Sequence, residues 1–129
     1  MDAPTDGFPN AIEITMAATP PWLSVARTVA ERLATQAEFD PDAIEDIRLA
    51  VDEACTAAAA QTRDGATIRC CFTVSPGRMD IEITTPAGQT PAPFAPLAWR
   101  LLRALTDSLT LRHHPGHQFT LRLTKESSR

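Results

Sequence analysis

Hydrophobic and polar residues alternate in five short segments of the chain, and this period of two predicts β-strands. In the first segment the apolar residues Ile12, Ile14 and Met16 are separated by polar ones. Turns containing proline and glycine join the second segment to the third and the fourth to the fifth, so each pair should form a hairpin. The expected strands cover residues 12–16, 68–74, 79–83, 109–111 and 119–123.

Three other segments space their apolar residues three and four positions apart, as amphipathic helices do. Thr19 and Asp40 each stand before a proline, which indicates a helix start with a capping side chain. Prolines are frequent over 84–96, which should form an irregular loop. The helices should cover 20–36, 41–62 and 97–107, with core-facing stripes on the first two of Trp22, Val25, Ala26, Val29 and Leu33, then Ile44, Ile47, Val51, Ala54 and Ala58.

This order of elements, βααββαββ, predicts an α+β fold: a two-layer sandwich with helices packed on one face of a mixed or antiparallel sheet. The chain has 129 residues, enough for one hydrophobic core and too few for two ordinary domains. We expect a disordered arm over 1–10, a single domain over 11–125 and a short tail over 126–129.

Composition and charge narrow the possible partners. Hydrophobic residues make up 43% and charged residues 22%, which is typical of a soluble globular domain. No apolar run approaches the roughly 20 residues of a membrane span, and residues 1–10 lack the pattern of a signal peptide, so we expect a cytoplasmic protein. The net charge is −4 and Lys125 is the only lysine, which argues against direct binding to nucleic acid.

The cysteines and histidines do not form a recognisable metal or redox motif. Cys55, Cys70 and Cys71 make neither a CxxC pair nor an even disulfide set, so we interpret them as free thiols. Three histidines bracket the last turn, and no cysteine or acidic residue lies nearby in the sequence. A polar turn is therefore a simpler interpretation than a zinc site. We therefore expect no metal centre from protein ligands alone.

The second helix carries an unusual polar face. Opposite its apolar stripe, acidic residues and alanines share one side, a pattern that fits either a solvated surface or a shallow surface on which a ligand or partner lies. The pattern alone leaves both readings open. The residues of this face are Asp42, Asp46, Glu53, Ala57 and Ala60.

Part of this helix resembles a known motif. Residues 47–56 read IRLAVDEACT, which is similar to the N-box helix of bacterial anti-sigma factors of the serine-kinase type. These proteins belong to the histidine-kinase-like (Bergerat) ATPase superfamily, and the likeness is greatest to actinobacterial anti-sigma factors of stress and development sigma factors. The element order also fits from Ala11 to Thr124. The match fails at Ala57, where the family has asparagine.

The resemblance implies a nucleotide site that has lost most of its determinants. It implies that Glu53 is the catalytic general base, that Ala57 stands where asparagine would hold Mg²⁺, and that Thr85 stands at or next to the aspartate that binds adenine. Ala87 replaces a glycine of the same motif, and prolines occupy the segment that should close on the phosphates. We therefore expect a Bergerat fold with a degenerate pocket, in which binding of ATP and Mg²⁺ is doubtful.

The resemblance also implies partners. Arg27 lies where family members contact both a sigma factor and an anti-anti-sigma factor of the STAS type, and the family implies a homodimer. Three hypotheses follow. The protein is an anti-sigma factor that sequesters an alternative sigma factor and is released by an antagonist, an active serine kinase of that antagonist, or an unrelated small α+β binding module.

Overall fold

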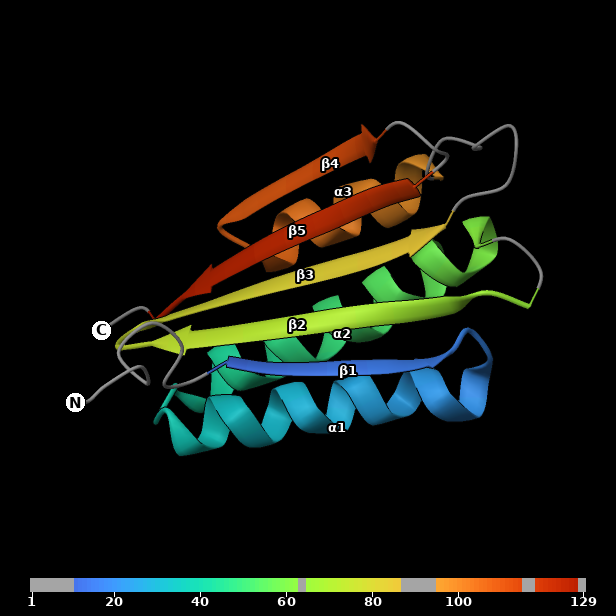
Figure 1. The fold of residues 1–129 in the computed structure, drawn as a ribbon. Helices are drawn as coiled ribbons and strands as arrows, with labels where there is room; N and C mark the ends of the chain where they lie inside the picture. Colours follow the sequence, from blue (N-terminus) through green and yellow to red (C-terminus); the bar gives the residue numbers. More distant parts are fainter. Residues whose placement is uncertain (1–10, 63–64, 87–94, 115–117, 128–129) are drawn as a thin grey trace.

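In the part of the chain that the structure describes, five strands form one antiparallel sheet, and three helices cover one of its faces (Figure 1). The computed structural model describes residues 11–62, 65–86, 95–114 and 118–127, so the arm expected over 1–10 lies outside the described residues. The strand order is β1-β2-β3-β5-β4. The elements are β1 Ala11–Ala17, α1 Pro20–Gln36, α2 Pro41–Gln61, β2 Thr67–Ser75, β3 Arg78–Pro86, α3 Pro96–Leu105, β4 Ser108–His114 and β5 Gln118–Glu126. The predicted α+β sandwich and its element order are confirmed.

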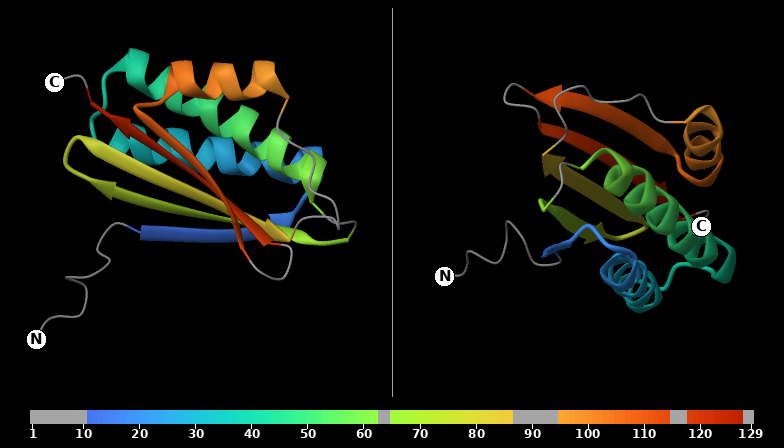
Figure 2. Two further views of the ribbon diagram at one scale, coloured as in Figure 1. Left: turned by 90° about the horizontal axis from the view of Figure 1, so that it is seen from above. Right: turned by 90° about the vertical axis from the view of Figure 1, so that its right-hand side faces the viewer.

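The hydrophobic core lies between the sheet and the helices. Alternate residues of the three central strands point to the helices and are buried, among them Phe72, Ile83 and Leu121. The central helix α2 packs against α1 on one side and α3 on the other (Figure 2). No helix among the described residues is long and apolar enough to cross a bilayer.

The core-facing stripe predicted for α1 is wrong in part. Trp22 is 56% exposed and Val25 is 40% exposed, although both were expected in the core. Three alanines and one leucine are buried on α1 instead, on the side that packs against α2 and the sheet. On α2 the expected stripe is buried except for Ile44, which is half-buried. The buried residues of α1 are Leu23, Ala26, Ala30 and Ala34.

The helix starts differ from the prediction in one respect. Both Thr19 and Asp40 precede a proline at the start of a helix, but neither side chain makes a capping hydrogen bond. At α1 the second helical residue is also a proline, Pro21, so one of the N–H groups that a cap would reach does not exist. The backbone carbonyl of Thr19 instead accepts from the N–H of Trp22 at 3.0 Å.

Several element boundaries also differ from the prediction. The strand expected to end at Ile83 continues to Pro86, because β3 keeps pairing with β5 through Thr85, which lies opposite Phe119. The third helix ends at Leu105, two residues earlier than expected, because the backbone N–H of Asp107 already bonds to β5. The loop predicted over 84–96 is therefore wrong for 84–86, which extend β3, and for Pro96, the first residue of α3; residues 87–94 lie outside the described residues.

The sheet face away from the helices is polar and stabilised by its own charge pairs. Asp80 of β3 accepts hydrogen bonds from Arg78 at 3.1 and 3.2 Å and from the Thr124 hydroxyl at 2.6 Å. Arg122 of β5 lies 3.8 Å from the same carboxylate. Burial by itself would raise the pKa of Asp80, but these hydrogen bonds outweigh it and hold the pKa below the ordinary 3.8.

We expect Asp80→Asn to lower the free energy of unfolding at pH 7 by about 1–2 kcal/mol, because it removes charge-assisted hydrogen bonds. A lowered folded-state pKa stabilises the native state above the unfolded pKa of 3.8, and this contribution is lost as the pH falls through the folded value. Urea denaturation of both proteins across the acid range should show the gap closing below that pH. A gap independent of pH would contradict the assignment.

Candidate functional site

One side of α2 presents the polar face that sequence analysis singled out, including Glu53, which the resemblance implies as the general base, and Ala57, which stands where asparagine would hold Mg²⁺. Asp46, Glu53 and Ala57 are seven and four residues apart, so they share one side of the helix. Asp46 bonds to Lys125 of β5 at 3.0 Å, which turns this side toward the half of the sheet that α3 covers. Glu53 is half-buried and has no hydrogen bond or ion pair within the described residues.

Thr85, expected at the adenine-binding position, is fully buried and bonded within the protein. Its hydroxyl lies 2.9 Å from that of Thr62, at the end of α2, and 3.2 Å from the carbonyl oxygen of Thr67. The Thr62 hydroxyl is also 2.8 Å from the carbonyl of Ala58. Each hydroxyl has one proton, so the pair can place one proton between the two oxygens and the other on a carbonyl. The hydroxyl proton of Thr85 is thus engaged by other groups of the protein.

The residues present do not supply the contacts with Mg²⁺ and ATP that the resembled motif has. Ala57 is half-buried and has no side-chain oxygen to offer a hard cation. The hydroxyl of Thr85 is engaged with Thr62 and Thr67. The position of Ala87 lies outside the described residues. Of the expected site, the Glu53 carboxylate therefore remains as a polar group on the α3 side of α2 that no other described residue engages.

Arg27 lies on the other side of α2, at the seam between α1 and α2. Its guanidinium is 3.8 Å from the carboxylate of Asp52, and both side chains are partly exposed. Farther along α2, Glu45 accepts hydrogen bonds from Arg48, while Leu49 remains exposed. Arg27 belongs to α1 and pairs with Asp52, whereas Glu53 lies on the side of α2 that carries Asp46. The seam is a charged surface with one exposed apolar side chain.

The cysteines are free thiols, as predicted. Cys55 of α2 and Cys70 of β2 are buried, with their sulfur atoms 4.0 Å apart. The contact with Cys70 and burial together raise the pKa of the Cys55 thiol, so it stays protonated. On the opposite sheet face, burial and the nearby carboxylates Glu13 and Glu82 raise the pKa of Cys71. These pKa shifts weaken all nucleophilic roles for Cys55 and Cys71.

Two histidines of the last hairpin make different contacts: one with a hydroxyl group and one with an aromatic ring. His114 is 3.1 Å from the hydroxyl of Thr120, and the ring of His113 lies 6.1 Å from that of Phe119. His117 lies outside the described residues. Among the described residues, no three histidine, cysteine or acidic side chains come together as metal ligands would.

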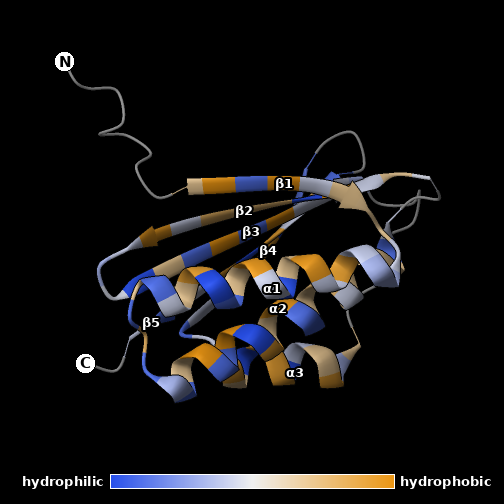
Figure 3. Ribbon diagram, turned by 90° about the horizontal axis from the view of Figure 1, so that it is seen from below, coloured by the Kyte–Doolittle hydropathy of each residue, from blue (hydrophilic) through white to orange (hydrophobic). Residues whose placement is uncertain are grey.

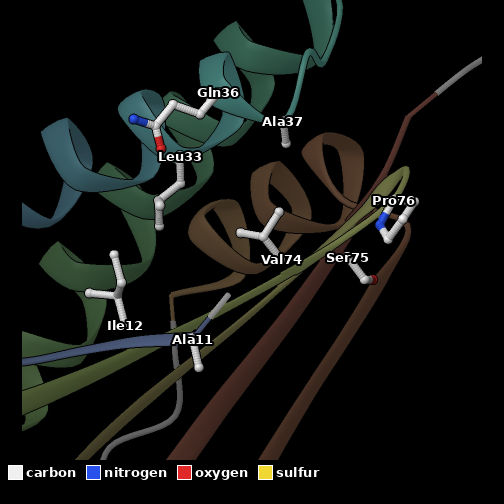
Figure 4. A pocket seen from close by; sticks show the side chains of 8 residues that line it. All are labelled: Ala11, Ile12, Leu33, Gln36, Ala37, Val74, Ser75 and Pro76. Atoms are coloured by element: carbon white, nitrogen blue, oxygen red, sulfur yellow. The ribbon is translucent and has the colours of Figure 1, made fainter. Parts of the chain in front are cut away.

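Sequence reasoning did not find a cavity of about 550 Å³ at the opposite end of the sheet from Thr85. Figure 4 shows Ile12, Leu33 and Val74 converging on it from β1, α1 and β2. Its walls are mostly apolar, and Gln36 and Ser75 supply polar groups at its rim. The lining residues are far apart in the sequence, so no local pattern could have indicated the cavity.

A family model described as a histidine kinase-like ATPase domain matches residues 16–125. The chain belongs to this family. Within the family, it is 33% identical over 123 residues to the anti-sigma-F factor RsbW of Mycobacterium tuberculosis, in strains CDC 1551 / Oshkosh and H37Rv. The match covers 91% of this chain and 71% of that relative, and it places the chain among RsbW-type anti-sigma factors.

A solved structure supports the same fold. The crystal structure of the RsbU and RsbW domains of Rv1364c from Mycobacterium tuberculosis matches 92% of this chain with a TM-score of 0.70. The sequence identity is 19%, and this chain spans 33% of that longer chain. The likeness therefore concerns the fold. The resemblance drawn from residues 47–56 is confirmed at the level of the family.

Proposed function

We propose that this protein is an anti-sigma factor that sequesters an alternative sigma factor of the stress or development class in the cytoplasm. The observation that carries the proposal is the 33% identity to the Mycobacterium tuberculosis anti-sigma-F factor over almost the whole chain. Release would come from an anti-anti-sigma protein of the STAS type that competes for the same anti-sigma factor. Neither step requires chemistry at Glu53.

The state of the pocket supports regulation by competition rather than by ATP. Ala57 supplies no metal ligand, and the buried Thr85 hydroxyl is bonded to Thr62 and Thr67. Each of these losses weakens nucleotide binding by roughly 1–3 kcal/mol. A protein that holds its sigma factor through helix surface can keep that function without nucleotide.

Arg27 is the residue that we assign to partner contact. It is held at the α1–α2 seam by Asp52 at a distance of 3.8 Å, a weak surface pair that a partner carboxylate can replace. Its planar guanidinium can make two parallel hydrogen bonds with such a carboxylate. The sigma factor and the antagonist would then compete for one side chain.

A homodimer is the second part of the proposal, and the edge strand β1 supports it. Within the described ranges β1 pairs with β2 alone, so its other edge can add a strand. Ile12, Trp22 and Val25 are exposed on β1 and α1. Two copies related by a two-fold axis could pair these strands and cover these side chains. Sedimentation equilibrium should show a dimer that Trp22→Glu dissociates, and a monomeric native chain would reject this arrangement.

The test of the main proposal is transcription in vitro with each alternative sigma factor from the same genome. The purified chain should inhibit one of them in proportion to its concentration without added nucleotide, and the cognate STAS protein should restore transcription. Inhibition of none of the sigma factors would overturn the proposal. Inhibition that requires ATP, with transfer of phosphate to the antagonist that Glu53→Ala abolishes, would instead support a serine kinase.

A further inference from the structure

Helix α3 exposes an apolar stripe on the side away from the core. Leu97 is 74% exposed and Leu101 is 42% exposed, and Ala104 completes the stripe at the next turn. These residues are four and three positions apart, so they lie on one face of the helix. The core side is filled by Leu102, with Trp99 half-buried beside it. Figure 3 shows α3 as an outer helix with both hydrophobic and hydrophilic residues on its visible side.

Two arginines flank this stripe on one side. Arg100 and Arg103 are exposed, and within the described residues neither guanidinium has a hydrogen-bond or ion-pair partner. The α3 sequence contains no acidic residue. Arg103 gains some stabilisation from its place in the last turn, where a cation complements the helix dipole, but Arg100 lies in the middle of the helix. These two arginines give α3 a positive charge in a chain whose net charge is −4.

We propose that α3 is a docking surface for an acidic amphipathic helix of a protein partner. Its leucines would pack between Leu97 and Leu101, and its carboxylates would pair with Arg100 and Arg103. A partner helix fits this surface because its apolar side chains at positions i and i+4 would match the spacing of the exposed leucines of α3. Charge complementarity selects an acidic partner over a basic or neutral one. This surface is separate from the α1–α2 seam, and the inference does not depend on the proposed function.

A protein partner suits the surface better than an anionic membrane does. α3 has ten residues, and its exposed apolar side chains are two leucines and one alanine. Interfacial membrane helices bury a long apolar face and rely on many basic residues. The stripe of α3 is the size of a local contact within a protein interface, where a few apolar anchors ringed by charges carry most of the affinity.

The experiment uses nuclear magnetic resonance of the isotope-labelled full chain. The probe is a synthetic helical peptide of about 18 residues, with leucines three and four positions apart and glutamates on both flanks. A matched peptide has lysine in place of each glutamate. The acidic peptide should shift the amide signals of residues 97–105 and bind about fivefold or more tightly than the lysine peptide. Added salt should reduce the difference.

Charge reversal makes the test specific. The double variant Arg100→Glu/Arg103→Glu changes exposed residues, so it should fold normally and prefer the lysine peptide. The control variant Arg112→Glu, on the exposed edge strand β4, should keep the native preference. Equal binding of the two peptides, or signal changes elsewhere in the chain, would overturn the proposal. So would shifts of α3 signals caused by anionic phosphatidylglycerol vesicles but by neither peptide.

Discussion

Thr85→Asp, which introduces at Thr85 the aspartate that the resembled motif has at or next to this position, should lower the free energy of unfolding by about 2–4 kcal/mol. Thr85 is fully buried and faces the carbonyl oxygen of Thr67 at 3.2 Å, so a carboxylate there would be desolvated and repelled. Urea denaturation measures the loss. Calorimetric titration with ATP and Mg²⁺ should show no saturable heat up to about millimolar nucleotide, because Ala57 still supplies no ligand.

Two further variants separate the loss of the hydroxyl from the added charge. Thr85→Val keeps the shape and removes the bonds to Thr62 and Thr67, and it should cost about 1–2 kcal/mol. Thr110→Asp adds the same charge at an exposed position on β4 opposite Arg122, and it should change stability by less than about 0.5 kcal/mol. If Thr85→Asp is as stable as the native chain and binds ATP, the site is open and our account of the pocket is wrong.

Arg27→Glu should weaken binding of the cognate sigma factor by about tenfold or more, since it replaces attraction to a partner carboxylate with repulsion. It should also weaken binding of the antagonist, because we assign both partners to this side chain. The fold should persist, since the pair with Asp52 spans 3.8 Å between partly exposed groups and contributes less than about 1 kcal/mol. Fluorescence anisotropy with a labelled sigma factor measures the change.

Arg32→Glu is the matched control for this variant. Arg32 is an exposed arginine on the same helix, and the substitution changes the net charge by the same amount. It should alter binding less than about twofold beyond the effect of overall charge. Equal losses in the two variants would mean that the sigma factor senses the charge of the whole protein. No loss in either would place the contact elsewhere.

The sequence predicted the fold well because periodicity reports which residues a strand or helix buries. The five strands and three helices follow directly from it. Periodicity failed to predict features that depend on how neighbouring elements pack or pair. The outward position of Trp22 depends on which side of α1 packs against α2 and the sheet, and the extension of β3 depends on pairing of Thr85 with Phe119. Neither contact is local in sequence.

The sequence predicted which residues occupy the candidate site, but it did not predict how their side chains are arranged. The absence of an oxygen at Ala57 can be read from the chain. The engagement of Thr85 by Thr62 cannot, because 23 residues separate the two hydroxyls and nothing in either segment indicates the other. The charge of α3 was likewise visible, whereas the exposure of Leu97 and Leu101 required knowing which side of the helix meets the core.

The bond between Lys125 and Asp46 has a practical consequence for the binding measurements. Lys125 is the only lysine in the chain, and its ammonium group ties the end of β5 to α2 at 3.0 Å. Reagents that acylate amines would neutralise that ammonium group and leave Asp46 without its partner. Coupling a sensor surface or a dye through the lysine would thus yield molecules in which the bond between Lys125 and Asp46 is broken. Capture through a terminal tag keeps the tie between β5 and α2 intact during partner binding.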